Sequence, residues 1–196
     1  PHAHARIRSI DTSKAEAVPG VKAVVIGSDL PEQADEFLGP ERVAQNFHHI
    51  TRNIMARENA LYEGHAVAAI AATTSAIANA AAALIDVAYE VLPHVIDVQE
   101  AMKEDAPLLF EDMLTRGVEP PPAKPSNISK RAQFGIGDTD TGFSQADHIV
   151  EREFTTEAVH QGYIETHATL AKYNEDGQAE VWCSSQGHFV IRALTA

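Results

Sequence analysis

Gln186 has the position in this 196-residue sequence that most favours chemistry. It ends a predicted strand, "AEVWCSSQ" (residues 179–186), and directly precedes a predicted helix that begins at Gly187. The first turn of a helix carries backbone N–H groups without intrahelical acceptors, and a side-chain amide beside them adds further donors. Such a group of donors can bind an oxyanion or a metal-oxo group.

His160, Glu165 and His167 are residues of types that bind metal ions. Glu165 and His167 are two positions apart in a predicted strand, so they share one face of it. A four-coordinate site needs one more ligand and a set of outer partners. Buried polar side chains in a network are the simpler interpretation, and we predict no metal site from these residues.

The segment "GIGDTDTG" (residues 135–142) has the composition of a phosphate-binding or calcium-binding loop. No strong strand precedes it, no helix is predicted directly after it, and no Lys-Ser/Thr pair ends it. Asp138 and Asp140 match the start of a calcium loop, but its third Asp/Asn and its sixth-position Gly are missing. We therefore predict a solvated turn that leads into a strand.

The remaining candidates are a cysteine and two pairs of histidines. Cys183 follows Trp182 on an apolar strand and the sequence places no base beside it, so we predict a buried, inert thiol. The pair His48 and His49 lies in a polar stretch, and the pair His2 and His4 shares one face of a strand; we predict that both pairs are solvated.

Two regions of different pattern must position these residues. Residues 1–105 combine alternating and helical periodicities, which predicts an α/β domain of ordinary size. Its first predicted elements are a strand over 3–10, a helix with a capping box at Ser13 and Glu16, a strand over 21–27, and an irregular stretch with short helical pieces over 28–60.

A second set of predicted elements follows: a strand over 66–73, a helix over 76–87 capped by Ser75, a strand over 88–97 that contains Pro93, and a short helix over 98–105. The helix over 76–87 has an apolar stripe of Ile77, Ala81, Leu84 and Ile85.

Residues 106–130 are predicted to be a linker, because "EPPPAKP" favours extended polyproline II structure. Residues 131–196 are β-rich, with predicted strands over 148–157, 163–173 and 179–186. The segment "NEDGQ" predicts a hairpin turn between the last two. The predicted fold class is α+β: an α/β domain followed by an incomplete β-rich region.

Charge and composition exclude several classes of protein. A formal net charge of −13 disfavours binding to nucleic acid or to an anionic membrane surface. The longest apolar run is mostly alanine and is interrupted by polar residues, which is too weak for a membrane span. One cysteine allows neither a disulfide framework nor a cysteine-ligated iron–sulfur or zinc site. These features fit a reducing compartment, and we predict the cytoplasm.

The ends of the sequence suggest a piece of a longer protein. The first residues already alternate as a strand should, without an initiator Met, and no capping residue follows the last apolar residue of the final helix.

Five segments, taken in order, resemble the molybdenum-binding large subunit of the xanthine dehydrogenase and aldehyde oxidase family, which includes aerobic carbon monoxide dehydrogenase large chains and bacterial N-heterocycle hydroxylases. The segments are "PHAHARIRSIDTSKAEAVPGVKAVVIGSDLP", "LYEGHAVAAIAATTSAIANAAAALIDVAYEVLP", "GDTDTGFSQADHIVERE", "YIETHATLAKY" and "WCSSQGHFVIR". The resemblance implies that residues 1–105 are an α/β hammerhead domain and that residues 131–196 begin the first molybdopterin-binding domain.

The resemblance also implies a function. Family members hydroxylate a carbon centre with water-derived oxygen at molybdenum held by molybdopterin, in bacteria as the cytosine dinucleotide. Electrons leave through iron–sulfur clusters and FAD on other subunits or domains. Gln186 matches the glutamine that hydrogen-bonds the apical oxo ligand of molybdenum, and a supporting shell around it matches Gln161, Gly162, Glu165 and His167.

The same resemblance places the catalytic glutamate and a "GGGFG" loop after Ala196, so we expect this chain alone to contain no catalytic residue, hold no cofactor and be inactive. The substrate stays open among xanthine, aldehydes, carbon monoxide and N-heterocycles. The alternative function is that of a non-catalytic α/β module for interaction or assembly.

Overall fold

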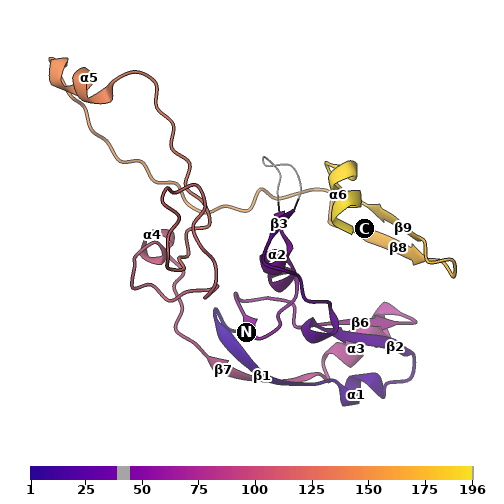
Figure 1. Ribbon diagram of the computed structural model, residues 1–196. Helices are drawn as coiled ribbons and strands as arrows, with labels where there is room; N and C mark the ends of the chain where they lie inside the picture. The colour runs from indigo at the N-terminus through magenta and orange to yellow at the C-terminus, as the bar shows by residue number, and fades with distance from the viewer. Residues whose placement is uncertain (39–44, 196) are drawn as a thin grey trace. The chain divides into compact units, whose positions relative to one another are not determined.

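The computed structural model describes residues 1–38 and 45–195, and the chain divides into one unit of residues 1–136 and another of residues 137–196 (Figure 1). Across the described residues, none of the helices combines the length and apolarity needed to cross a membrane. The structure has both helices and antiparallel strands, which confirms the predicted α+β class.

Two antiparallel sheets form the frame of the first unit. In one, β1 (Ala5–Asp11) lies between β5 (Asn59–Ala60) and β7 (Asp86–Val91). In the other, β2 (Val21–Ile26) pairs with β6 (Ala68–Ala72). Each sheet therefore joins an early strand to a late one, and the two strand–helix–strand patterns of the sequence form one interleaved domain.

Small side chains let the helices approach these sheets closely. α1 (Ser13–Glu16) contacts β2, and α3 (Ser75–Ala82) contacts both β6 and α1. Ala15 of α1 and Ala81 of α3 are fully buried, so both helices contribute to the packing of this unit. The other elements of this unit are η1 (Gly27–Asp29), β3 (Phe37–Leu38), β4 (Gln45–Asn46), α2 (Phe47–Ile54) and α4 (Val98–Ala101). The stretch over 28–60 does contain short helices, as predicted, although its residues 39–44 lie outside the described part.

Both predicted helix caps are wrong by one residue. The Thr74 hydroxyl oxygen, and not that of Ser75, accepts a hydrogen bond from the Ile77 N–H at 3.2 Å. Thr12, and not Ser13, precedes α1, and its hydroxyl donates to the carboxylate of Glu16. Threonine and serine are both good caps, so two successive hydroxyl residues leave the helix start ambiguous in the sequence.

Thr74→Ala is expected to lower the free energy of unfolding by about 1 kcal/mol, because it removes the acceptor for one N–H group of the first turn. Ser75→Ala is the matched control and should change the free energy of unfolding by less than about 0.5 kcal/mol. Urea unfolding of both variants measures the difference. An equal or larger loss in Ser75→Ala would contradict the assignment of the cap.

Three further predictions about residues 1–105 are corrected. β7 begins at Asp86 and ends at Val91, so Pro93 lies beyond the strand and accepts a hydrogen bond through its carbonyl from His4 Nδ1 at 2.9 Å. That contact buries His4, which is only 5% exposed and not solvated. α3 ends at Ala82, so Leu84, which was predicted to belong to the apolar stripe of this helix, lies beyond the helix and is 42% exposed.

His65 is a second buried histidine of the first unit. Its Nδ1 accepts a hydrogen bond from the Leu61 N–H at 3.1 Å, and its ring stacks on that of Tyr62 with centroids 4.5 Å apart. Burial lowers the pKa of His65 below its ordinary value of 6.5. The carbonyls of Asn53 and Arg52 offset part of this effect, although neither makes a well-formed hydrogen bond with Nε2.

The first unit is therefore expected to lose stability as the pH falls below 6.5. In this range the unfolded state binds a proton at His65 and the folded state does not, so the free energy of unfolding decreases on acidification until the folded-state pKa is reached. Urea unfolding at neutral pH and at mildly acidic pH measures this slope. His65→Gln, whose amide oxygen can still accept from Leu61, should show a smaller slope, and an unchanged slope would contradict the assignment.

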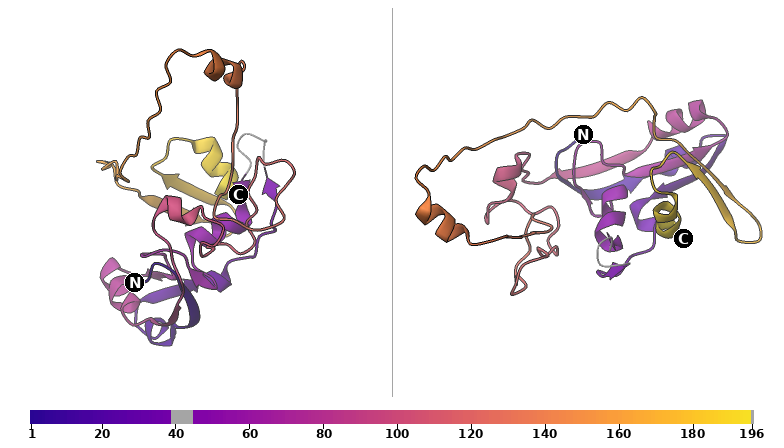
Figure 2. Two further views of the ribbon diagram at one scale, coloured as in Figure 1. Left: turned by 90° about the vertical axis from the view of Figure 1, so that its left-hand side faces the viewer. Right: turned by 90° about the horizontal axis from the view of Figure 1, so that it is seen from above.

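The second unit contains a hairpin and two helices. β8 (Thr169–Tyr173) and β9 (Ala179–Cys183) are antiparallel, and the three views of Figures 1 and 2 place α6 (His188–Thr195) beside them. The predicted hairpin turn is confirmed: the Asn174 N–H donates to the Gln178 carbonyl at 2.8 Å, and Gly177 has a φ of 82°. Of the residues in this unit whose burial the structure describes, none is buried.

The predicted turn in "GIGDTDTG" is solvated, but it leads into a helix and not a strand. The Asp138 carboxylate accepts from the Thr141 N–H at 3.0 Å and caps α5 (Thr139–Gln145). Residues 148–157, predicted to be a strand, have no regular structure. β8 and β9 are also shorter than predicted.

Candidate functional site

The first candidate site lies at the open end of the β8–β9 hairpin. Pairing begins with Thr169 opposite Cys183, and the Ser184 N–H then donates to the Ala168 carbonyl at 3.3 Å. The Ser184 hydroxyl donates in turn to the Thr166 carbonyl at 3.4 Å. The segments that flank the strands therefore stay side by side, and they bring residues 165–168 and 184–187 to the same end of the hairpin.

Gln186 is exposed and comes directly before Gly187, whose carbonyl accepts the first intrahelical hydrogen bond of α6, from the Ile191 N–H at 2.9 Å. The N–H groups of the first turn have no acceptor within the helix. The position predicted for Gln186, a side-chain amide at the start of a helix, is thus present, although β9 ends at Cys183 and a short connection separates the two elements. These are donors of the kind that hold an oxo or anionic group.

Two hollows border the β8–β9 hairpin. A shallow groove of about 480 Å³ is lined by Glu165, Thr166 and Ser184, among others. A larger hollow of about 880 Å³ lies along α6 and includes Trp182. Cys183 lines both and is half-buried, so the prediction of a buried thiol is wrong.

The four residues predicted to support Gln186 lie in the segment that leads into β8, and not on the strand itself. The Gln161 side-chain amide donates to the Tyr163 hydroxyl at 2.6 Å, and the Gly162 N–H donates to His160 Nδ1 at 3.0 Å. The His167 ring lies 5.3 Å from that of Tyr163. Glu165 is exposed, and it forms no metal-ligand cluster with the two neighbouring histidines in the part of the chain that the structure describes.

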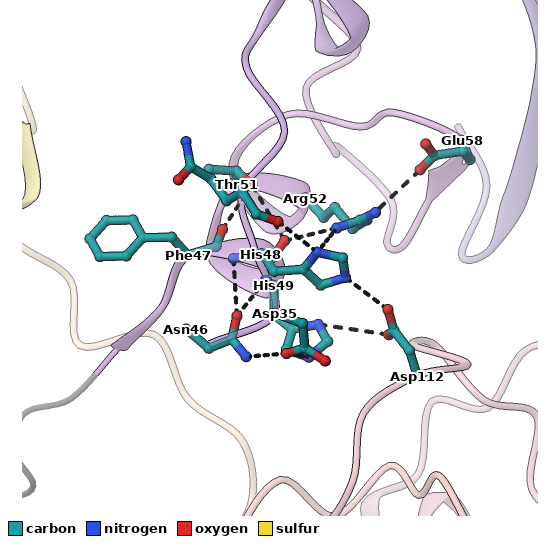
Figure 3. A network of polar contacts seen from close by, with 10 residues as sticks. Asp35, Asn46, Phe47, His48, His49, Thr51, Arg52, Glu58 and Asp112 are labelled. Atoms are coloured by element: carbon teal, nitrogen blue, oxygen red, sulfur yellow. Dashed lines mark hydrogen bonds and ion pairs between the residues drawn. The ribbon is translucent and has the colours of Figure 1, made fainter. Parts of the chain in front are cut away.

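The second candidate site is a polar network in the first unit, around the start of α2 (Figure 3). The Asn46 side-chain oxygen caps the helix by accepting from the N–H groups of His48 and His49, at 3.0 and 3.4 Å. The Asn46 side-chain amide donates to the Asp35 carboxylate at 2.6 Å. This cap fixes the two histidines at the first turn of the helix, where they face Asp112.

Asp112 approaches both imidazoles. Its Oδ2 accepts a hydrogen bond from His48 Nε2 at 2.7 Å, and its Oδ1 lies 3.9 Å from His49 Nδ1. Burial raises the pKa of Asp112, but the hydrogen bond and the charges of the two histidines outweigh burial and hold the pKa below its usual 3.8. The two histidine side chains are only 15% and 16% exposed, so the prediction of a solvated pair is wrong.

Burial is the main cause that lowers the pKa of His49 below 6.5, and the charge of Asp112 offsets part of it. The sequence alone does not reveal the cluster of His48, His49 and Asp112. The cap signal of Asn46 two residues before His48 is readable in the sequence, but the contact with Asp112 spans 64 residues and is not.

Comparison with protein families and known proteins relates both units to one group of enzymes. Residues 1–93 match the family described as aldehyde oxidase and xanthine dehydrogenase, a/b hammerhead domain, and residues 121–196 match the molybdopterin cofactor-binding domain. The chain is 33% identical to the carbon monoxide dehydrogenase large chain of Afipia carboxidovorans. The alignment is 205 residues long and covers 100% of this chain and 24% of that relative.

Solved structures agree with these matches. The crystal structure of Cu,Mo-CO dehydrogenase in its carbon monoxide reduced state has a TM-score of 0.75 and 32% identity, over 99% of this chain and 24% of that one. Quinoline 2-oxidoreductase from Pseudomonas putida 86 has a TM-score of 0.74 and 26% identity, over 100% of this chain and 23% of that one. The chain thus spans about a quarter of the length of these relatives.

Proposed function

Since this chain belongs to the aldehyde oxidase and xanthine dehydrogenase family, we propose that it is part of the large subunit of a molybdenum hydroxylase. In this proposal residues 1–105 are the hammerhead domain and residues 131–196 begin the cofactor-binding domain. Residues 106–130 link them, and the Asn127 side-chain amide ties this linker to the end of α4 by donating to the Ala101 carbonyl at 3.1 Å.

The observation that carries the proposal is the group of donors at the start of α6. Gln186 directly precedes the first turn of α6, at the end of a hairpin in the segment that matches the cofactor-binding domain. These donors fit an oxo ligand, which accepts hydrogen bonds and carries negative charge. When bound, a molybdopterin cofactor, in its cytosine dinucleotide form, supplies oxidation of a carbon centre with water-derived oxygen.

This chain contributes positioning to that chemistry. The Gln186 amide would donate to the oxo ligand, and Glu165, His167, Gln161 and Gly162, in the segment that leads into β8, would form the supporting shell around it. Cys183 is the one cysteine of the sequence, and an iron–sulfur cluster needs four ligands, so the clusters that pass electrons to FAD would lie outside these residues, in this proposal on partner subunits. A small molecule, either an aldehyde, an N-heterocycle such as xanthine, or carbon monoxide, is the substrate, and the cytoplasm is the compartment.

Elemental analysis of the complete large subunit, purified with its partner subunits, tests this function. About one molybdenum per chain, together with iron and flavin in the complex, is the expected result. The same complex from cells grown with tungstate in place of molybdate is the control and should be inactive. An assembled complex without molybdenum would contradict the proposal.

A further inference from the structure

We propose that His48, His49 and Asp112 form a binding site for a divalent transition-metal ion, with zinc as the best fit, within the first unit. The inference is independent of the molybdenum chemistry. In the part of the chain that the structure describes, these three residues are the one group of metal-binding side chains whose ligand atoms all lie within 4.8 Å of one another.

The most direct sign of a missing ligand is His49 Nδ1. This nitrogen is buried and has no hydrogen-bond partner, and it faces Asp112 Oδ1 across 3.9 Å. That separation is too long for a hydrogen bond. It is close to the roughly 3.4 Å between two ligands of one tetrahedral zinc, given metal–ligand bonds of about 2.1 Å. A metal ion between the two atoms would satisfy both.

The groups near the second nitrogen of each imidazole are of the kinds that surround metal-binding histidines. The far nitrogen of His49, Nε2, lies 3.9 Å from the Asp35 carboxylate, which is beyond hydrogen-bond distance, so Asp35 contributes its charge there, and Asn46 holds that carboxylate in place. The far nitrogen of His48, Nδ1, lies 3.1 Å from the Gln33 carbonyl. A carboxylate or a backbone carbonyl on the second ring nitrogen fixes the tautomer in which the first nitrogen is free to bind metal.

Metal binding by His48 requires only local proton movement. Its Nε2 now donates to Asp112; for metal to bind there, the single proton of the neutral ring would move from Nε2 to Nδ1 and be donated to the Gln33 carbonyl. Arg52 Nη1 approaches the same Nδ1 at 2.6 Å, but it also lies 3.3 Å from the His48 carbonyl and can donate there instead. Glu58, 3.9 Å from Arg52 Nε, offsets the arginine charge.

The donor types select the ion. Two imidazoles and one carboxylate suit zinc and its neighbours, whereas calcium and magnesium prefer oxygen ligands alone. Three protein ligands leave a fourth position for water. Because the site joins α2 to a residue 64 positions later, a bound ion would fasten the segment after α4 to the hammerhead unit and stabilise it by mass action.

Titration of the metal-free chain with Co²⁺, a visible-absorbing substitute for zinc, tests the site, and Zn²⁺ competition gives the zinc affinity. We expect one Co²⁺ per chain in the wild type, displaced by one Zn²⁺. His49→Gln and Asp112→Asn should each weaken binding by at least about 100-fold, and Asp35→Asn, which removes an outer partner, by about 10-fold. His94→Gln, at an exposed histidine of the same unit, is the matched control and should leave the affinity unchanged.

A second readout separates binding from folding. Saturating Zn²⁺ should raise the melting temperature of the wild type and of His94→Gln, but not of His49→Gln or Asp112→Asn, and metal-free variants that melt cooperatively show that they are folded. Absence of saturable one-to-one binding in the wild type would overturn the proposal even if a variant failed to fold. Equal affinities in the wild type, His49→Gln and Asp112→Asn would overturn it as well.

Discussion

An assembled enzyme that carries Gln186→Ala is expected to turn over about 100-fold more slowly than the wild type, because loss of one preorganised hydrogen-bond donor to a developing or permanent oxyanion costs about 10²–10³ in kcat. Gln186 is exposed at the start of α6 and packs against no core, so the fold should not change. Molybdenum content and KM should stay close to those of the wild type. A fall in kcat without a change in KM marks an interaction that matters in the transition state and not in substrate binding.

The control for this variant is Gln178→Ala. Gln178 lies in the turn at the other end of the same hairpin, is also exposed, and contributes its backbone to the turn. Its replacement should leave kcat unchanged. Steady-state kinetics and molybdenum analysis of both variants measure the effect of Gln186 on kcat. If Gln186→Ala enzyme with its full molybdenum content kept the kcat of the wild type, Gln186 would have no role in the proposed function.

The sequence predicts those parts of the fold that depend on neighbouring residues. Alternation over residues 3–10 and the β-branched run over 21–27 locate β1 and β2, and the predicted strand–helix order around Gln186 is present, although an unpredicted connection separates β9 from α6. Strand partners depend on distant residues, so the pairing of β1 with β7 is not readable. Residues 148–157 have a strand-like pattern but no partner strand among the described residues, and a strand without a partner leaves its backbone groups to water.

The two candidate sites differ in the same way. The position of Gln186 follows from local order, since a strand end and a helix start are both visible within a few residues. His48 and His49 stand in a polar stretch, where solvated side chains are the reasonable expectation. The approach of Asp112 to both imidazoles is visible only in the folded structure. His4 shows the same error and Cys183 the reverse one, because burial depends on which segments cover a strand and not on the strand itself.

Gly27→Ala is expected to lower the free energy of unfolding by roughly 3 kcal/mol, which is at the upper end for overpacking. Gly27 is buried at the start of η1, and a Cβ atom there would lie 2.2 Å from the Ala56 carbonyl oxygen and 2.8 Å from its carbonyl carbon. This neighbour is backbone and cannot rotate away. Ala56 is fully buried and its N–H donates to the Ala66 carbonyl at 2.8 Å, so relief of the clash would disrupt other contacts.

Arg57 makes the same region still less able to adjust. Its guanidinium donates to the Leu30 carbonyl and, at 2.9 Å, to the Pro31 carbonyl, and so ties the chain after η1 to the residue that follows Ala56. A drop of about 10 °C in melting temperature is expected for a unit of this size. Gly135→Ala is the matched control, since Gly135 has open space around it and no positive φ, and its melting temperature should stay within about 2 °C of the wild type. Thermal unfolding of both variants measures the contrast. Similar melting temperatures would mean that η1 can move away from Ala56, and that the close approach of these two segments does not limit the stability of the first unit.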